Sequence, residues 1–219
     1  NVGASPIQNI GAYGVEAKDT ILKVEGINVV TKKIFELNNA ECKFDYRYSI
    51  FKNELKHKVV ITFVYFKLSK TPNLITHYGN IEEEIEKIGE KSISTVRQAV
   101  INIRKRKLPD PAELGNAGSF FKNPLVSIND FEEIKKRFDK APSYPASENS
   151  VKVPAGWLIE QCGWKGKQVG DCGVHKDQAL VLVNYGNATG NEILNLAKQI
   201  QKSVHDQFGI ELEMEVNVV

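Results

Sequence analysis

The sequence has few of the residues that cross-link proteins and no segment suited to a membrane. Its three cysteines, Cys42, Cys162 and Cys172, are odd in number, and no two of them have the two-residue spacing of zinc sites or redox dithiols. No run approaches the ~18 consecutive apolar residues of a membrane helix, and the first residues, NVGASPIQN, lack the pattern of a secretion signal. We therefore expect a cytoplasmic protein without membrane insertion.

An excess of charge of either sign is absent as well. Lysine and arginine number 29 and aspartate and glutamate 27 among 219 residues, which gives a formal net charge of +2. Proteins that bind phosphate backbones usually carry a strongly basic surface, so nucleic acid is not expected as a partner. The basic run at residues 104–107 is better explained by a helix end, where cations offset the helix dipole. The four histidines lack metal-ligand spacing, and we predict no metal site.

The second half of the chain carries clear secondary-structure signals. Thr189 and Glu192 have the spacing of a capping box, and apolar residues then recur at helical spacing up to Gly209, which predicts a helix. Residues 211–219 alternate strictly between apolar and polar, which predicts a half-buried strand.

Two further elements are predicted upstream of that helix. Phenylalanine and isoleucine recur at helical spacing over residues 128–138, behind a cap at Asn129 or Asp130. The run ALVLVN at 179–184 predicts a short buried strand. With 42% hydrophobic and 26% charged residues, the chain has the composition of one large or two small globular domains.

The first half predicts a hairpin, a strand and a helix. Strand-like runs at about 21–24 and 29–35 are separated by glycine and asparagine, which suggests a hairpin. Residues 59–68 are rich in β-branched and aromatic side chains and predict a strand. A helix is expected over 94–106, and it must end before the prolines of residues 108–111, which we take as a domain boundary.

Three segments and one acidic residue invite functional readings that their local sequence leaves open. In GNAGSFFKNP (115–124), a turn with two glycines can present the Ser119 hydroxyl to a pocket as an acid or hydrogen-bond donor, or merely join two elements. NIGAYGVE (9–16) is a turn that can approach phosphate or an aromatic cofactor. The glycine- and lysine-rich segment 163–176 fits a diphosphate cradle or a solvated loop equally well. Glu215 reads by default as one acid of a solvated strand face.

Taken together, six ordered segments resemble one enzyme family. They are SPIQNIGAYGVE (5–16), YRYSIFK (46–52), KLPDP (107–111), GNAGSFFKNP (115–124), AGWLIEQCGWKG (155–166) and VHKDQALVLVN (174–184). The chain resembles the UDP-N-acetylenolpyruvylglucosamine reductases, or MurB family, along its whole length. Tyr78, within ITHYGN, suggests the longer subtype, in which a tyrosine loop covers the substrate.

The resemblance implies an α+β fold of two mixed domains. Residues 1–108 would form the remainder of an FAD-binding domain of the vanillyl-alcohol-oxidase type. Residues 109–219 would form the MurB C-terminal substrate-binding domain, with the last strand, 211–219, returning to the flavin site.

Site residues follow from matching the family's motifs one position at a time. The proton-donating serine falls on Ser119, the active-site arginine on Arg47 and the C-terminal glutamate on Glu215. Met214 stands where the family motif L-E-P-E-V has proline. The implied substrate contacts are Tyr78, Lys107, Asn123, Tyr144, Lys165 and Gln178. The implied flavin contacts are Ser5, Pro6, Gln8, Asn9, Gly11, Tyr13 and Gly14.

The reaction implied by the resemblance uses FAD and NADPH. Flavin reduced by NADPH passes a hydride to UDP-N-acetylglucosamine enolpyruvate, which yields UDP-N-acetylmuramate for peptidoglycan and so serves cell-wall growth, shape and division. Arg47 would hold the substrate carboxylate and the charge that develops beside it. Ser119 would supply the proton, and Glu215 would donate a hydrogen bond to the enolate. The expected partners are the UDP-sugar and NADPH, and the expected state is a monomer.

The family also has an FAD-binding region ahead of the NIGAYG segment. The sequence of this chain begins just before that segment, so we expect the N-terminal part of the FAD-binding domain to be missing from it. The alternative to an active reductase is therefore a flavin-poor, non-catalytic module that binds nucleotide sugars. An RNA-binding module that uses residues 104–107 is a third alternative, with little support from the net charge.

Overall fold

The computed structural model describes residues 2–218, and the chain divides into two compact units, residues 1–103 and 104–219. The division falls inside helix α2 (Ile93–Lys107), a few residues before the proline cluster that the sequence suggests as a boundary. Both units combine helices with antiparallel sheets, so the fold class is α+β, as predicted. No helix among the described residues is both long enough and apolar enough to cross a membrane.

The first unit begins with a short hairpin. Its elements are the 3-10 turn η1 (Val2–Ala4), strands β1 (Gly11–Ala12) and β2 (Val15–Glu16), and the 3-10 turn η2 (Ala17–Asp19). The two residues that connect β1 to β2, Tyr13 and Gly14, have φ of 55° and 82°. Two consecutive left-handed residues give the twist that the tightest hairpins need. The NIGAYG motif is therefore a defined hairpin rather than an open loop.

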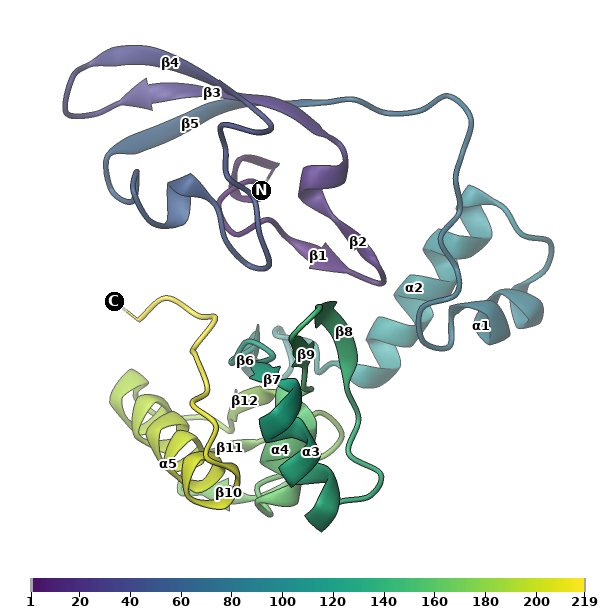
Figure 1. Cartoon of the computed structure of the whole chain (residues 1–219), viewed down its shortest axis with the longest axis vertical. Helices are drawn as coiled ribbons and strands as arrows, with labels where there is room; N and C mark the ends of the chain where they lie inside the picture. Colours follow the sequence, from purple (N-terminus) through teal and green to yellow (C-terminus); the bar gives the residue numbers. More distant parts are fainter. Residues whose placement is uncertain (1, 219) are drawn as a thin grey trace. The chain divides into compact units, whose positions relative to one another are not determined.

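The largest sheet described in the first unit has three antiparallel strands (Figure 1). Its order is β4 (Lys33–Asn38), β3 (Ile21–Asn28) and β5 (Val59–Phe66), so the predicted hairpin and the predicted third strand are confirmed. Gly26, however, lies within β3 and does not end it. A Cβ atom there would come within 2.5 Å of the Val60 carbonyl and 2.6 Å of the Phe35 ring, so glycine permits close packing inside the sheet.

One face of this sheet packs over a small core. Val24, Cys42 and Phe51 are buried there, and Phe51 lies in the 3-10 turn η3 (Ile50–Lys52). The loop from β4 to η3 therefore follows the edge of the core, which fixes the backbone on both sides of residues 45–49.

Two helices complete the first unit. The predicted helix of residues 94–106 is confirmed as α2, one residue longer at each end, and it ends at the prolines as expected. Helix α1 (Ile81–Ile88) was not predicted. The two helices bury Ile81, Ile85 and Ile103 between them, and Tyr13 of the hairpin packs on the same cluster.

Among its described residues, the second unit contains two sheets and three helices besides the end of α2 (Figure 1). The four-stranded sheet has the order β10 (Gln168–Val169), β11 (Cys172–Val174), β12 (Val181–Asn184) and β6 (Gly115–Ser119). The three-stranded sheet has the order β7 (Leu125–Ser127), β9 (Ser150–Lys152) and β8 (Tyr144–Ser147). The helices are α3 (Ile128–Arg137), α4 (Ala155–Gln161) and α5 (Gly190–Phe208).

Helix α5 follows its sequence signals closely. The Thr189 side chain accepts a hydrogen bond from the backbone N–H of Glu192, the Glu192 carboxylate binds back to Thr189, and Gly209 ends the helix with φ of 68°. The buried face of α5, which includes Ile200 and Val204, packs into the single large core of this unit. The predicted strand within residues 179–184 is confirmed as β12.

Two expectations for the second unit need correction. The cap of α3 is Ser127, whose hydroxyl accepts from the backbone N–H of Asp130 at 3.1 Å, and not Asn129 or Asp130. The predicted strand at 211–219 reduces to a single bridge between Met214 and Phe121. Leu212 on the predicted apolar face is buried, but Val218 is exposed, so the alternation marks a buried position without supplying a partner strand along the segment.

Candidate active site

Arg47 lies in the loop before η3 and contacts the first hairpin. Its backbone is left-handed, with φ of 53°, and its Nη2 donates a hydrogen bond to the Gly11 carbonyl at 2.7 Å. A Cβ atom at Gly11 would lie 3.2 Å from Nη1 of Arg47 and 2.8 Å from Cγ of Glu16. The absence of a side chain at Gly11 therefore lets the guanidinium approach the hairpin backbone. The structure thus brings the predicted arginine against the predicted flavin segment.

Tyr78 meets the same hairpin from another direction. Its ring lies edge-on to that of Tyr13, with 6.4 Å between the ring centroids, and its side chain is partly exposed. Gly14 stands beside it, because a Cβ atom there would lie 3.7 Å from Cβ of Tyr78. An edge-to-face pair holds both rings in a defined orientation while leaving Tyr78 accessible. Two predicted site residues, Tyr13 and Tyr78, are therefore neighbours.

The remaining predicted flavin residues lie in the turn that precedes the hairpin. Pro6 is buried, Ser5 and Gln8 are half-buried, and the Ser5 hydroxyl donates to the Val2 carbonyl at 2.7 Å. Ile7 and Ile10 of the same turn are exposed, at 40% and 46% of their surface. The segment is thus ordered by internal contacts, and it presents apolar side chains outward.

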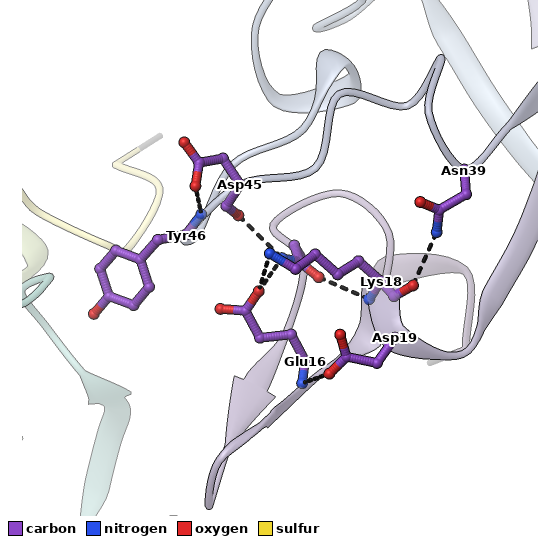
Figure 2. Close-up of polar contacts among 7 residues, drawn as sticks. Glu16, Lys18, Asp19, Asn39, Asp45 and Tyr46 are labelled. Atoms are coloured by element: carbon purple, nitrogen blue, oxygen red, sulfur yellow. Dashed lines mark hydrogen bonds and ion pairs between the residues drawn. The ribbon is translucent and has the colours of Figure 1, made fainter. Parts of the chain in front are cut away.

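Asn9 is fully buried and forms hydrogen bonds with Glu16, Lys18 and Asp45. Figure 2 labels these three partners. Nδ2 of Asn9 donates to Oε2 of Glu16 at 2.8 Å and to the backbone carbonyl of Asp45 at 3.0 Å. Its Oδ1 accepts from the backbone N–H of Lys18 at 2.9 Å. The ammonium group of Lys18 lies 2.9 Å from the same Glu16 oxygen, and this hydrogen bond raises the pKa of Lys18.

In the second unit, Ser119 ends strand β6 beside an irregularity in the sheet. Ser119 pairs with Val181, and the register of β6 against β12 shifts just before this pair. Gly118 has φ of 73°, which the absence of a Cβ allows without strain. Phe120 and Phe121 then turn into the core, with ring centroids 5.3 Å apart. Ser119 itself is exposed.

Glu215 is brought next to this strand by backbone hydrogen bonds. The N–H of Glu215 donates to the Phe120 carbonyl at 2.8 Å, and the N–H of Lys122 donates to the Glu213 carbonyl at 2.9 Å. Glu213 is exposed, whereas Glu215 is half-buried. Glu215 is therefore not simply one acid of a solvated face, and it lies beside the residue that follows Ser119.

Asn123 and Gln178 lie at the first turn of helix α4. Oδ1 of Asn123 accepts from the backbone N–H of Ala155 at 2.9 Å, so Asn123 binds one of the free N–H groups at the start of this helix. A Cβ atom on Gly156 would lie 3.4 Å from Oε1 of Gln178. The backbone after Gln178 pairs with the Ser119 segment, because Phe120 donates to the Leu180 carbonyl.

The other three predicted substrate residues of this unit are more dispersed. Lys165 forms an ion pair of 2.9 Å with Glu160, at the far end of α4 from Asn123. Tyr144 begins β8, is about half exposed and pairs with Lys152 of β9. Lys107 is exposed in the last turn of α2.

The thiols lack the character of nucleophiles. Burial raises the pKa of Cys42 and of Cys162 to about 11 and also raises the pKa of Cys172. Each is therefore a neutral thiol near pH 7. Among residues 2–218, no group of three or more His, Cys, Asp or Glu side chains is arranged to hold a metal ion.

Sequence reasoning missed Ser49 and Asp45, which support Arg47 from either side. Ser49 is fully buried, and its hydroxyl donates to the Ile7 carbonyl. The one signal that pointed to it is its place within the YRYSIFK segment, next to a fixed arginine. Asp45 acts through its backbone carbonyl, so its side-chain type gave no indication of this role.

Comparisons with known proteins agree with the resemblance in the sequence. The family model for the C-terminal domain of UDP-N-acetylenolpyruvoylglucosamine reductase matches residues 110–219. A protein of that name from Flavobacterium johnsoniae is 58% identical over 222 residues, which cover 100% of this chain and 66% of the relative. One from Chromobacterium violaceum is 49% identical and covers 98% of this chain and 64% of the relative.

A solved structure matches as well. The crystal structure of UDP-N-acetylenolpyruvylglucosamine reductase (MurB) from Thermus caldophilus covers 99% of this chain and 59% of its own, with a TM-score of 0.63 and 24% identity, which supports the fold alone. The chain belongs to the UDP-N-acetylenolpyruvoylglucosamine reductase family. It spans 64–66% of the length of the first two curated relatives it matches.

Proposed function

We propose that this chain is part of a reductase that converts UDP-N-acetylglucosamine enolpyruvate to UDP-N-acetylmuramate with FAD and NADPH, in the cytoplasmic synthesis of peptidoglycan precursors. The observation that carries the proposal is the pairing of the Ser119 segment with the Glu215 segment through Phe120. Two residues that lie far apart in sequence, and that the resemblance assigns to one reaction, are thereby neighbours within one unit.

The turn and hairpin of residues 5–14 fit a flat aromatic cofactor such as the flavin of FAD. The segment is ordered by buried Pro6 and Asn9, has no side chain at Gly11 and exposes Ile7 and Ile10. A surface of bare backbone and apolar side chains suits an aromatic ring with polar edges. When bound and reduced by NADPH, the flavin would supply a hydride to the substrate.

Arg47 is proposed to bind the carboxylate of the enolpyruvyl group. A guanidinium can pair with both carboxylate oxygens, and it stabilises the negative charge that develops next to that carboxylate during reduction. The hydrogen bond from Nη2 of Arg47 to the Gly11 carbonyl holds the group in place before substrate arrives. Tyr78, which is partly exposed and oriented by Tyr13, is proposed to cover the substrate.

Ser119 is proposed to deliver the proton to the substrate carbon, and Glu215 to assist. An alcohol is a weak acid, so the step depends on placement more than on a matched pKa. The sheet pairing of Ser119 and the backbone bond of Glu215 to Phe120 supply that placement. Glu215 is proposed to assist through a hydrogen bond to the developing enolate, made by its carboxyl group or by a water that it holds.

The remaining residues are proposed to bind the nucleotide sugar. Lys165 and Tyr144 would contact the diphosphate, and Lys107, Asn123 and Gln178 would contact other parts of the substrate. Because Lys165 pairs with Glu160 in this structure, diphosphate binding would exchange one anionic partner for another.

Replacing Ser119 by Ala tests the proposal. In the FAD-loaded protein, reduction of flavin by NADPH should be unchanged, because that half-reaction needs no proton on the substrate carbon. Reoxidation by the enolpyruvyl substrate should slow by about 10²- to 10⁴-fold, the usual effect of a lost general acid. Ser119→Cys should recover part of the rate, since a thiol still donates a proton. Rapid-mixing measurement of flavin absorbance separates the two half-reactions.

A matched control is Ser203→Ala in the same unit. The Ser203 hydroxyl bonds to the Gln199 carbonyl one turn earlier in α5, a bond whose loss a helix tolerates. A Ser119→Ala protein that reoxidises at the wild-type rate would remove Ser119 from the mechanism. A protein that binds the UDP-sugar without flavin absorbance or turnover would instead be a nucleotide-sugar-binding module.

A further inference from the structure

We propose that Asn9 is a positioning residue, which holds the loop of Arg47 against the first hairpin and so keeps the Arg47 guanidinium at the Gly11 carbonyl. The inference rests on the proposed function, in which Arg47 binds the substrate carboxylate. It gives Asn9 a role different from the direct flavin contact that the resemblance implies.

The side chain of Asn9 is fully engaged inside the first unit. An amide group has two N–H donors, and those of Asn9 serve the Glu16 carboxylate and the Asp45 carbonyl. Its oxygen accepts from Lys18, and the residue has 0% of its surface exposed. No part of this side chain is therefore presented to a ligand. Asn9 can affect the site only by positioning the groups to which it is hydrogen-bonded.

The partner that matters for catalysis is the loop around Arg47. Asp45, two residues before Arg47, is bound through its carbonyl to Asn9, and Ser49, two residues after it, is bound through its hydroxyl to Ile7. The loop is thus attached to the 7–11 segment on both sides of Arg47. The bond from Arg47 to Gly11 lies between these two attachments.

Such attachments are needed because Arg47 adopts a costly conformation. Its φ of 53° lies in the left-handed region, which a residue with a Cβ atom occupies only when its surroundings impose it. Without the attachments, the loop would relax toward ordinary backbone angles and the guanidinium would leave Gly11. An arginine that must be ordered at each binding event loses affinity and rate, and fixing it beforehand avoids that loss.

The first test measures Arg47 directly and needs no catalysis. In the 219-residue chain labelled with ¹⁵N, the side-chain signals of Arg47 are assigned by their loss in Arg47→Lys, and their hydrogen exchange with water is measured. Asn9→Ala should speed this exchange by about tenfold, the effect of losing one or two net hydrogen bonds. If Asn9→Ala does not fold, Ser49→Ala takes its place. It is a small apolar replacement at a buried site and should also speed the hydrogen exchange of Arg47.

Asn39→Ala is the matched control. Nδ2 of Asn39 also donates to two backbone carbonyls, those of Lys18 and Ile21, so it supports the same η2 turn, and neither bond runs to the Arg47 loop. Asn39→Ala should leave the hydrogen exchange of Arg47 within about twofold of wild type. The Asn39 amide donates to backbone carbonyls as the Asn9 amide does, but to carbonyls outside the Arg47 loop.

The second test is a double-mutant cycle on the oxidation of reduced flavin by substrate, in protein normalised for bound FAD. If Asn9 acts through Arg47, Asn9→Ala should slow this step in wild type and have little further effect in Arg47→Lys. The positioning role would be overturned if the effects of Asn9→Ala and Arg47→Lys on the oxidation rate multiply in the double variant. It would also be overturned if the hydrogen exchange of Arg47 is unchanged in both Asn9→Ala and Ser49→Ala. Faster Arg47 exchange in a protein that never reduces the substrate would sink the proposed function and leave the positioning of Arg47 standing.

Discussion

Met214→Pro should be tolerated, although proline usually disrupts paired backbone. The hydrogen bonds that join the C-terminal segment to the Ser119 segment run from Glu215 N–H to Phe120 and from Lys122 N–H to Glu213. In an antiparallel pair the bonded residues alternate, so Met214 occupies the non-bonded position opposite Phe121, and its N–H points away from this neighbour. Proline at residue 214 therefore removes no hydrogen bond between the two segments.

The expected balance of free energies is close to zero. Proline restricts the unfolded chain and contributes about 0.4–1 kcal/mol of stability where the backbone accepts it. Met214 is only partly buried against the core, and the proline ring replaces part of its contact, so the lost burial costs about 1 kcal/mol. Glu215→Pro, by contrast, removes the donor to Phe120 and should cost about 1–3 kcal/mol.

The assay uses the two tryptophans, Trp157 and Trp164, which both lie in the second unit. Urea unfolding followed by tryptophan fluorescence therefore reports this unit, even if the first unit unfolds separately. Met214→Pro should keep its stability within about 1 kcal/mol of wild type, and Glu215→Pro should fall well below it. A Met214→Pro protein that is the less stable of the two would refute the assigned pairing.

Three further outcomes are expected. Thr189→Ala should cost about 1 kcal/mol of unfolding free energy by loss of the α5 cap, and Thr189→Ser should restore it, as measured by urea unfolding. Burial raises the pKa of Cys162 from 9.0 to about 11, so above pH 9 the folded state keeps a proton that the unfolded chain releases. The contribution of Cys162 to stability should be constant below pH 9 and be lost between pH 9 and 11, and Cys162→Ala should reduce the fall in stability over that range in unfolding curves. Gly11→Ala should destabilise the first unit by about 1–3 kcal/mol in circular dichroism melts, because the new methyl group meets Glu16 and the Val15 carbonyl.

Local signals were sufficient where an element is defined by its own residues. Helix α5 was predictable because its cap, its apolar spacing and its terminal glycine all lie within one segment. Helix α1 had a usable signal in Ile81, Ile85 and Ile88, which follow helical spacing, but the segment is only eight residues long. The α3 cap was misplaced because serine, asparagine and aspartate stand close together there, and any of them can cap a helix.

Local sequence patterns failed to predict structure where the contacting residue lies far along the chain. The alternation in residues 211–219 correctly marks Leu212 as buried, yet it carries no information on how much partner strand exists. The burial of Asn9 depends on Asp45, 36 residues away, whose contribution is a backbone carbonyl. Backbone atoms are the same in every residue, so no motif in one sequence can reveal such a contact.

The placement of Ser119 and Glu215 depends on one peptide of this kind. The N–H of Phe120 donates to Leu180 and its carbonyl accepts from Glu215, so both polar groups of a single buried residue join segments about 60 and 95 positions further along the chain. The phenylalanine ring in the core fixes the position of that residue, and the two hydrogen bonds fix its rotation. The spacing of the two proposed catalytic residues is therefore set by main-chain geometry. Side-chain changes at Met214 should be tolerated for the same reason, whereas any change that moves the Phe120 backbone would displace Ser119 and Glu215 together.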